Sequence, residues 1–191
     1  MQLTTDLDQA IAILKSGGVI VYPTETSYGL GCDATNTDAV ARIFAMKGRP
    51  EAKGVTAILP ENYSGKEFGF VWPSKLKELA ERHWPGPLTI VLPVGTSSPF
   101  VPKYLTDGTF AIRRSSHPIA NILVDALGVP LVSTSANISG EPASYSAADI
   151  YKRFLQQTLR PDCIIDAGEL PKNLPSTLVK IDDDGAVVVL R

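Results

Sequence analysis

A run of hydroxyl side chains follows a short apolar stretch in "PLVSTSANISG", which spans residues 130–140. Ser133, Ser135 and Asn137 occupy alternate positions there, as they would at the end of a strand. Such a segment could supply a serine nucleophile that a nearby base activates. It could instead hold a ligand through its hydroxyls and backbone N–H groups.

The candidate bases give the nucleophile little support. His83 and His117 have neither metal-ligand spacing nor a clear acidic partner, and no G-x-S-x-G motif occurs. A Ser-His hydrolase is therefore a disfavoured alternative that the sequence leaves open.

Three cations gather in "KGRPEAK" at residues 47–53, where a glycine and a proline end an expected helix. Lys47, Arg49 and Lys53 could form a solvated helix end, because the helix dipole favours cations there. They could also bind phosphate, with lysine as a point charge and arginine as a planar fork. No G-x-x-x-x-G-K-[ST] loop occurs, so ATP would have to be bound by such residues instead.

Two further polar segments follow apolar runs. "PTETSYGLG" at residues 23–31 supplies the hydroxyls of Thr24, Thr26 and Tyr28 as an expected ligand loop. In "FAIRRSSHP", Arg113 and its neighbour close an apolar strand, where a cation needs a partner. A carboxylate or phosphate ligand would serve, and so would an internal Asp or Glu.

Other motifs indicate structure more than chemistry. "GLGCDA" at residues 29–34 fits a dinucleotide fingerprint, but the intervening "TETSY" separates it from the preceding strand, so we interpret it as a decoy. "WPGPLT" at residues 84–89 predicts a rigid turn with Trp84 packed in the core.

The elements that position these residues alternate between helix and strand. Thr5 is the expected N-cap of a first helix that ends at Gly17. Further helices are expected to begin near Thr37, Ser74, Ser116 and Ser146. Apolar runs predict strands at residues 19–23, 55–59, 88–94, 109–113, 130–134, 163–167, 177–181 and 186–190.

These elements predict one α/β domain over residues 1–191. Its sheet should be twisted, with parallel and antiparallel strands and flanking helices. The last two strands are expected to form a hairpin around "DDDG", so the sheet cannot be purely parallel.

Composition restricts the functional classes. The 191 residues carry a formal net charge of −2, which argues against a small basic nucleic-acid-binding domain. No apolar run is long enough for a membrane helix, and the N-terminus lacks a signal-peptide pattern. Cys32 and Cys163 are far apart and predict buried thiols in a reducing cytoplasm.

Taken together, "PTETSYGLG", "KGRP", "WPGPLTIVL", "AIR" and "STSANISG" resemble the YrdC/TsaC family of threonylcarbamoyl-AMP synthases, in its short bacterial form. The resemblance implies a YrdC-like α/β fold with an open concave cleft. It also implies synthesis of threonylcarbamoyl-adenylate and pyrophosphate from L-threonine, bicarbonate or CO2, and ATP. The product would serve threonylcarbamoyladenosine (t6A) modification of tRNAs that read codons beginning with A.

The resemblance also implies roles for individual residues. Lys47 and Arg49 match the catalytic positions that bind the ATP phosphates. Positions that match further ATP contacts are Lys53, Thr109, Ser135, Asn137, Ala143 and Arg191. Positions that match threonine contacts are Thr24 or Thr26, Tyr28, Arg113, Ser133 and Ser176. Mg2+ is expected through the phosphates, with no dedicated metal ligands. Arg191 is the last residue, where fraying would weaken its contact.

The family's partners are TsaD, TsaB and TsaE, which transfer the product onto tRNA, and no membrane is involved. An RNA- or tRNA-binding module without its own catalysis is the alternative, because relatives have been described as binding double-stranded RNA. A carbamoyl-transfer unit like that of hydrogenase maturation proteins is a third possibility, which the missing zinc-finger and acylphosphatase parts disfavour.

Overall fold

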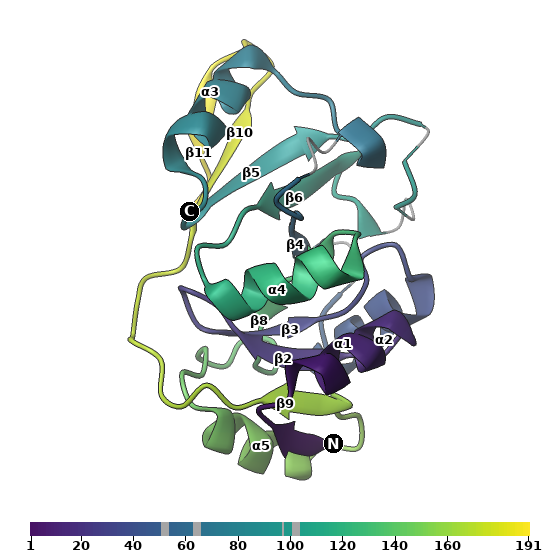
Figure 1. The fold of residues 1–191 in the computed structure, drawn as a ribbon. Coiled ribbons are helices and arrows are strands. Elements are labelled where there is room, and N and C mark those ends of the chain that lie inside the picture. Colours follow the sequence, from purple (N-terminus) through teal and green to yellow (C-terminus); the bar gives the residue numbers. More distant parts are fainter. Residues whose placement is uncertain (51–53, 63–65, 97, 101–103) are drawn as a thin grey trace.

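The structure is a computed structural model that describes residues 1–50, 54–62, 66–96, 98–100 and 104–191 (Figure 1). Helices and strands alternate along most of the chain. The helices are α1 (Leu7–Lys15), α2 (Thr37–Lys47), the 3-10 turn η2 (Lys66–Phe68), α3 (Ser74–His83), α4 (Pro118–Leu127) and α5 (Ala147–Leu155). The strands are β1 (Gln2–Thr4), β2 (Ile20–Pro23), β3 (Tyr28–Gly31), β4 (Thr56–Ile58), β5 (Leu88–Pro93), β6 (Thr109–Arg113), β7 (Leu131–Val132), β8 (Thr134–Ser135), β9 (Cys163–Ile165), β10 (Thr177–Ile181) and β11 (Val187–Val189).

The described strands form two mixed sheets. One has the order β1-β9-β2-β3-β8, and the other has the order β11-β10-β5-β6-β4-β7. Strand β2 is parallel to β9 and antiparallel to β3, while β6 is parallel to β4 and antiparallel to β5. The predicted α/β class and mixed pairing are confirmed, but the strands divide between two sheets where the sequence predicted one.

The division occurs at Ser133, inside the segment predicted as a single strand. Strand β7 pairs with β4 in one sheet, and β8 pairs with β3 in the other. Between them, the Ser133 backbone N–H donates to the Thr56 carbonyl at 2.7 Å. The chain thus crosses from sheet to sheet at Ser133, and its hydroxyl-rich segment lies where the two sheets meet.

Helices α1 and α4 pack together against the first sheet (Figure 1). Leu14 of α1 and Leu123 of α4 are buried in one apolar cluster with Ile20 of β2. The first cap differs from the prediction. Asp6, not Thr5, caps α1, because its carboxylate accepts from the Gln9 N–H at 3.1 Å.

The other helix starts lie within a residue of their predicted positions. Asn36 caps α2 and His117 caps α4, each one residue from the predicted start, whereas Ser146 caps α5 as predicted.

Strand β3 was predicted as part of a loop, and that part of the prediction is wrong. It pairs with β2 as a hairpin whose turn is residues 24–27. A Cβ atom at Gly31 would lie 2.4 Å from a Tyr22 ring carbon and 2.7 Å from the Val132 carbonyl oxygen. The "GLG" glycines therefore allow the strands to pack closely, which agrees with the interpretation of "GLGCDA" as a false match to the dinucleotide fingerprint.

The predicted C-terminal hairpin is confirmed as β10 and β11. Arg191 is held to it, because the Leu178 N–H donates to the Arg191 carbonyl at 3.0 Å. None of the described helices has the length and apolar character needed to cross a membrane.

Candidate functional site

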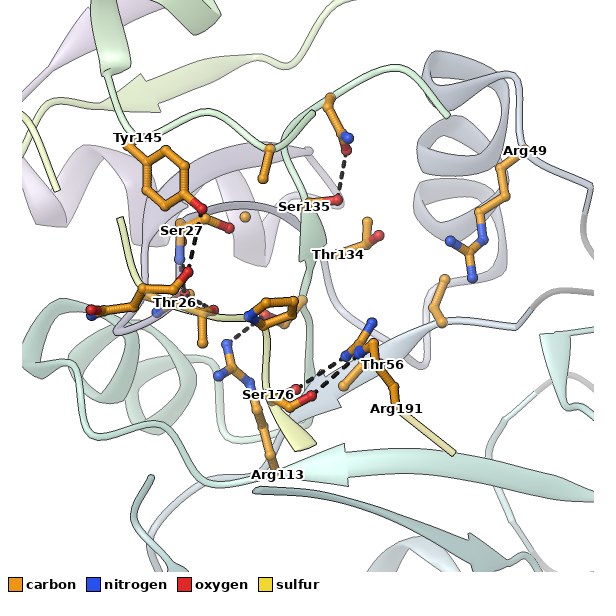
Figure 2. Close-up of a pocket in the computed structure, with 18 residues that line it drawn as sticks. Thr26, Ser27, Arg49, Thr56, Arg113, Thr134, Ser135, Tyr145, Ser176 and Arg191 are labelled. Carbon is orange, nitrogen blue, oxygen red and sulfur yellow. Dashed lines mark hydrogen bonds between the residues drawn. The ribbon is translucent and has the colours of Figure 1, made fainter. Parts of the chain in front are cut away.

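A cavity of about 290 Å³ lies between the two sheets and is lined by polar side chains (Figure 2). Its walls come from the β2–β3 turn, the end of α2, strands β4 and β6, and the crossing at Ser133. The segment before β10 and Arg191, beyond β11, complete them. The lining residues are Thr24, Thr26, Ser27, Gly29, Arg49, Val55, Thr56, Arg113, Ser133, Thr134, Ser135, Asn137, Ala143, Tyr145, Asn173, Pro175, Ser176 and Arg191.

Two arginines give one side of the cavity a strong positive charge. Arg49 enters it from just beyond α2, and Arg191 enters it from just beyond β11 (Figure 2). Arg191 is oriented by Ser176, because its guanidinium donates to the Ser176 carbonyl and hydroxyl, both at 3.2 Å. Burial and then the charge of Arg191 lower the pKa of Arg49. Two cations that repel one another favour an anion bound between them.

The end of α2 aims Arg49 at this position. Gly48 adopts the left-handed conformation, with φ of 57°, and the Arg49 N–H donates back to the Phe44 carbonyl at 3.1 Å. This turn releases Arg49 from the helix at its C-terminus, where the dipole favours a cation.

Lys47 lies behind the cavity and does not line it. Its ammonium is buried and donates to the Asn137 carbonyl at 2.9 Å, to the Asn137 side-chain oxygen at 2.8 Å and to the Ser135 carbonyl. Burial and then the charge of Arg49 lower the pKa of Lys47 to about 8. Lys47 therefore holds the loop that carries Ser135 and Asn137, both of which do line the cavity.

Arg113 has an internal partner, one of the two alternatives that the sequence left open. It is 4% exposed and donates to the Glu25 carboxylate, whose other oxygen accepts from the Ser115 hydroxyl. A second guanidinium nitrogen lies 3.4 Å from the Ser133 hydroxyl. Arg113 still lines the cavity, so its guanidinium contacts Glu25 on one side and faces the interior of the site on the other.

The β2–β3 turn distinguishes Thr24 from Thr26. Both line the cavity, and their hydroxyls are hydrogen-bonded to each other at 3.0 Å, but the Thr24 hydroxyl also donates to the Ser27 carbonyl at 2.7 Å and accepts from the Thr26 N–H at 3.2 Å. Thr24 is 3% exposed, whereas Thr26 is more exposed. Thr26 is therefore better placed to contact a ligand.

Residues 166–176 run from the first sheet to the second and bring Asn173 and Ser176 to the cavity (Figure 1). Tyr28 anchors the start of this strap. Its hydroxyl donates to the Gly168 carbonyl at 2.8 Å and accepts from the Ala167 N–H at 2.9 Å. Asn173 fastens the middle, because its amide donates to the Glu25 carbonyl at 2.9 Å.

Most of the predicted site residues meet at this one cavity. Those that do are Arg49, Ser135, Asn137, Ala143, Arg191, Thr24, Thr26, Arg113, Ser133 and Ser176. Tyr28 and Thr109 do not line it, for different reasons. Tyr28 is buried against the strap, and Thr109 begins β6 at the end opposite Arg113. Lys53 lies outside the described residues.

Five polar lining residues were not among the predicted site residues. They are Ser27, Thr56, Thr134, Tyr145 and Asn173. Thr56 lies in an apolar strand, and Asn173 lies in a segment without a motif. The pairing of β4, the crossing at Ser133, the segment before α5 and the path of the strap bring these residues together.

The chain is similar to several known proteins. The family model for Sua5/YciO/YrdC proteins, whose description is telomere recombination, matches residues 12–191 of this chain. A threonylcarbamoyl-AMP synthase of Halorhodospira halophila is 43% identical over 147 residues, which are 76% of this chain and 75% of that protein. One from Pyrococcus abyssi is 36% identical over 176 residues, which are 91% of this chain and 50% of that protein.

Solved structures show the same fold. The crystal structure of Pyrococcus abyssi Sua5 complexed with L-threonine has a TM-score of 0.85 at 35% identity, and the match covers 97% of this chain and 53% of that one. Escherichia coli YciO has a TM-score of 0.83 at 31% identity, with coverage of 97% and 87%. The chain thus spans about half of the Pyrococcus protein and most of YciO.

Proposed function

This chain belongs to the Sua5/YciO/YrdC family, and on that premise we propose that it is a threonylcarbamoyl-AMP synthase, an enzyme of the nucleotidyltransferase class. The proposal rests on one observation: two groups of residues in the same cavity suit two different ligands. Arg49 and Arg191 form a site for a polyanion, and Arg113 with its neighbouring hydroxyls forms a site for a small carboxylate.

The proposed reaction joins L-threonine, CO2 from bicarbonate, and ATP. The threonine amine captures CO2 as a carbamate and loses a proton. A carbamate oxygen then attacks the α-phosphorus of ATP, and the bond to pyrophosphate breaks. No protein nucleophile takes part, so the enzyme acts by positioning the reactants and neutralising charge.

The phosphates are assigned to Arg49 and Arg191. Planar guanidinium groups bind phosphate oxygens in pairs, and bound phosphate would offset the repulsion between the two cations. Mg2+ is assigned to the phosphates themselves. Among the described residues, no group of three His, Cys, Asp or Glu could hold a metal ion. Lys47 supports this half of the site through the loop at Ser135 and Asn137.

Threonine is assigned to the other half of the cavity. Arg113 would pair with the threonine carboxylate while it keeps its contact with Glu25, because a guanidinium has five N–H donors. Thr26 and Ser133 also line the cavity and supply hydroxyls, and the Ser176 hydroxyl, which accepts from Arg191, lies next to the phosphate half. The proposed reaction requires the threonine amine to face the phosphate-binding arginines.

Product analysis tests the proposal. We expect pyrophosphate release only when ATP, threonine and bicarbonate are all present, with a product whose mass equals threonylcarbamoyl-adenylate. Release that is independent of threonine would contradict the proposal. In the same proposal the product passes to TsaD, TsaB and TsaE in the cytoplasm for the t6A modification of tRNA.

A further inference from the structure

A second cavity, of about 520 Å³, is lined by α3 and the residues that flank it, and by Arg114, which follows β6. Trp72 precedes α3, and Trp84 follows it. Their rings meet edge to face, with centroids 5.8 Å apart and planes at 81°. Both side chains are half-buried and line the cavity. We call this space the tryptophan cavity.

Two consecutive arginines line different cavities. Arg113, the last residue of β6, lines the cavity between the sheets, and Arg114, which follows β6, lines the tryptophan cavity. This agrees with extended backbone, in which successive side chains point to opposite faces. The "WPGP" turn is tied to the same point, because the Gly86 N–H donates to the Arg114 carbonyl at 2.9 Å. The turn therefore keeps Trp84 next to Arg114.

The described lining of the tryptophan cavity carries more positive than negative groups. Among the described residues, its lining includes the cations Lys66, Lys77 and Arg114 and the single acid Glu81. The Lys77 ammonium lies 3.9 Å from the Glu81 carboxylate, but both side chains are about two-thirds exposed, at 67% and 65%. An ion pair this exposed is weak, so it can rearrange when a ligand binds.

The orientation of one indole is defined by a hydrogen bond. The Trp84 N–H donates to the Leu88 carbonyl at 2.6 Å, so the ring is held in place by its polar edge. Buried Leu59 and Ala80 complete an apolar floor. Flat aromatic walls, an apolar floor and surrounding cations together suit a planar ring that carries an anionic group.

We propose that the tryptophan cavity is a second binding site whose occupant is a nucleotide, either free or as one unit of a single strand. A base would stack on the face of one indole and meet the other edge to face, because the two planes lie at 81°, and its phosphate would bind Arg114 and the lysines. An acidic peptide would match the charge but would leave the flat apolar walls less completely covered. The inference stands on this cavity alone and does not depend on the proposed synthase activity.

Tryptophan fluorescence provides a direct test. The sequence contains two tryptophans, and both line this cavity, so their emission reports on it. Adenosine monophosphate and a short single-stranded oligoadenylate RNA are titrated separately. We expect saturable quenching that weakens with salt. If adenosine monophosphate binds as tightly as the RNA does per nucleotide, the occupant is a free nucleotide. If the RNA binds much more tightly and with a steep salt dependence, the occupant is a strand.

Variants that keep both tryptophans locate the ligand. Lys77→Glu and Arg114→Gln should each weaken binding about tenfold. Lys180→Glu, at an exposed position of β10, is the charge-matched control and should bind normally. Arg49→Gln, in the other cavity, should also leave the quenching unchanged.

Three outcomes would overturn the proposal. Quenching could be absent with both probes at millimolar concentration, or it could persist unchanged in Lys77→Glu and Arg114→Gln. It could also disappear in Arg49→Gln, which would place the ligand between the sheets. Lys77 is exposed, so its variant remains informative if Arg114→Gln fails to fold.

Discussion

Arg113 illustrates how one side chain can serve both folding and binding. Its guanidinium is nearly buried, and Glu25 provides the opposite charge that makes this burial tolerable. Removing Arg113 outright would leave Glu25 with an uncompensated charge. An alanine variant would therefore combine a loss of binding with a loss of stability. A substitution that keeps the charge separates the two effects.

We predict that Arg113→Lys raises the KM for threonine about tenfold and changes kcat much less. Lysine preserves the charge opposite Glu25 but loses the planar fork that can pair with a carboxylate. The measurement is pyrophosphate release at varied threonine concentration. Arg114→Lys, the same change one residue on and facing the other cavity, is the matched control. An unchanged KM in Arg113→Lys would remove Arg113 from the threonine site.

Lys47 is a buried cation whose charge the fold disfavours. Burial and Arg49 lower its pKa from 10.5 in the unfolded chain to about 8 in the folded protein. Between these values the unfolded state binds more protons than the folded state. The Lys47 contribution to the free energy of unfolding is therefore greatest above pH 10.5 and is lost as the pH falls through about 8.

We predict that a comparison of the wild type with Lys47→Met reveals this contribution to the free energy of unfolding. The free energy of unfolding of the wild type minus that of Lys47→Met should rise between about pH 8 and pH 10.5. The slope should not exceed about 1.4 kcal/mol per pH unit. Urea unfolding of both proteins at several pH values provides the measurement, and the variant removes the background from other groups. A difference that stays flat or falls would contradict the lowered pKa.

At the scale of the element, α2 shows how a helix end delivers a functional side chain. The helix carries Val40, Ile43 and Phe44 into the core and ends at Gly48, which has φ of 57°. A Cβ atom added at Gly48 would contact nothing within 4 Å. The glycine is therefore required by backbone conformation and not by space.

We predict that Gly48→Ala lowers the free energy of unfolding by about 1 kcal/mol, because alanine disfavours the left-handed conformation. Gly48→Asn should cost less, since asparagine tolerates that conformation at helix ends. Gly48→Ala should also raise the KM for ATP by displacing Arg49. Urea unfolding and ATP-dependent kinetics of the two variants check this order. Equal costs for alanine and asparagine would argue against backbone strain as the cause.

At the scale of the whole molecule, charge is distributed unevenly. The chain has a formal net charge of −2, yet Arg49, Arg113 and Arg191 all line the cavity between the sheets, where Arg113 pairs with Glu25. An ATP molecule would meet a local positive field in an acidic protein. Salt screens exposed charges at distances beyond about 8 Å at physiological ionic strength.

We predict that the Kd for ATP rises about tenfold between roughly 50 mM and 500 mM salt, whereas the Kd for threonine rises less than about threefold. ATP carries several negative charges, and threonine is a zwitterion without net charge. Calorimetric titration of each ligand across this range is the test. A salt dependence of equal size for both would contradict the separate phosphate and amino-acid halves of the site.

The amino-acid sequence by itself determined the elements and the chemical character of the site. Hydrophobic periodicity is local, so it predicted β6, the β10–β11 hairpin and the helices to within a few residues. The cluster of cations and hydroxyls without a triad likewise indicated binding and charge neutralisation. Strand β3 was missed, because its glycines resemble a loop until Tyr22 and Val132 are seen packed against them.

Only the tertiary structure decided which of these residues meet. Long-range strand pairing leaves no local signature, so the division into two sheets at Ser133 could not be predicted. The role of Lys47 could not be predicted either. Its place beside Arg49 in the sequence suggested phosphate binding, but its ammonium is buried and donates to carbonyls of another loop. Asn173 reaches the cavity through the path of the strap, and Tyr145, which precedes α5, donates its hydroxyl to the Asn173 carbonyl at 3.3 Å. The sequence thus contained the chemistry of the site, and the fold determined which groups face the ligand and which support them.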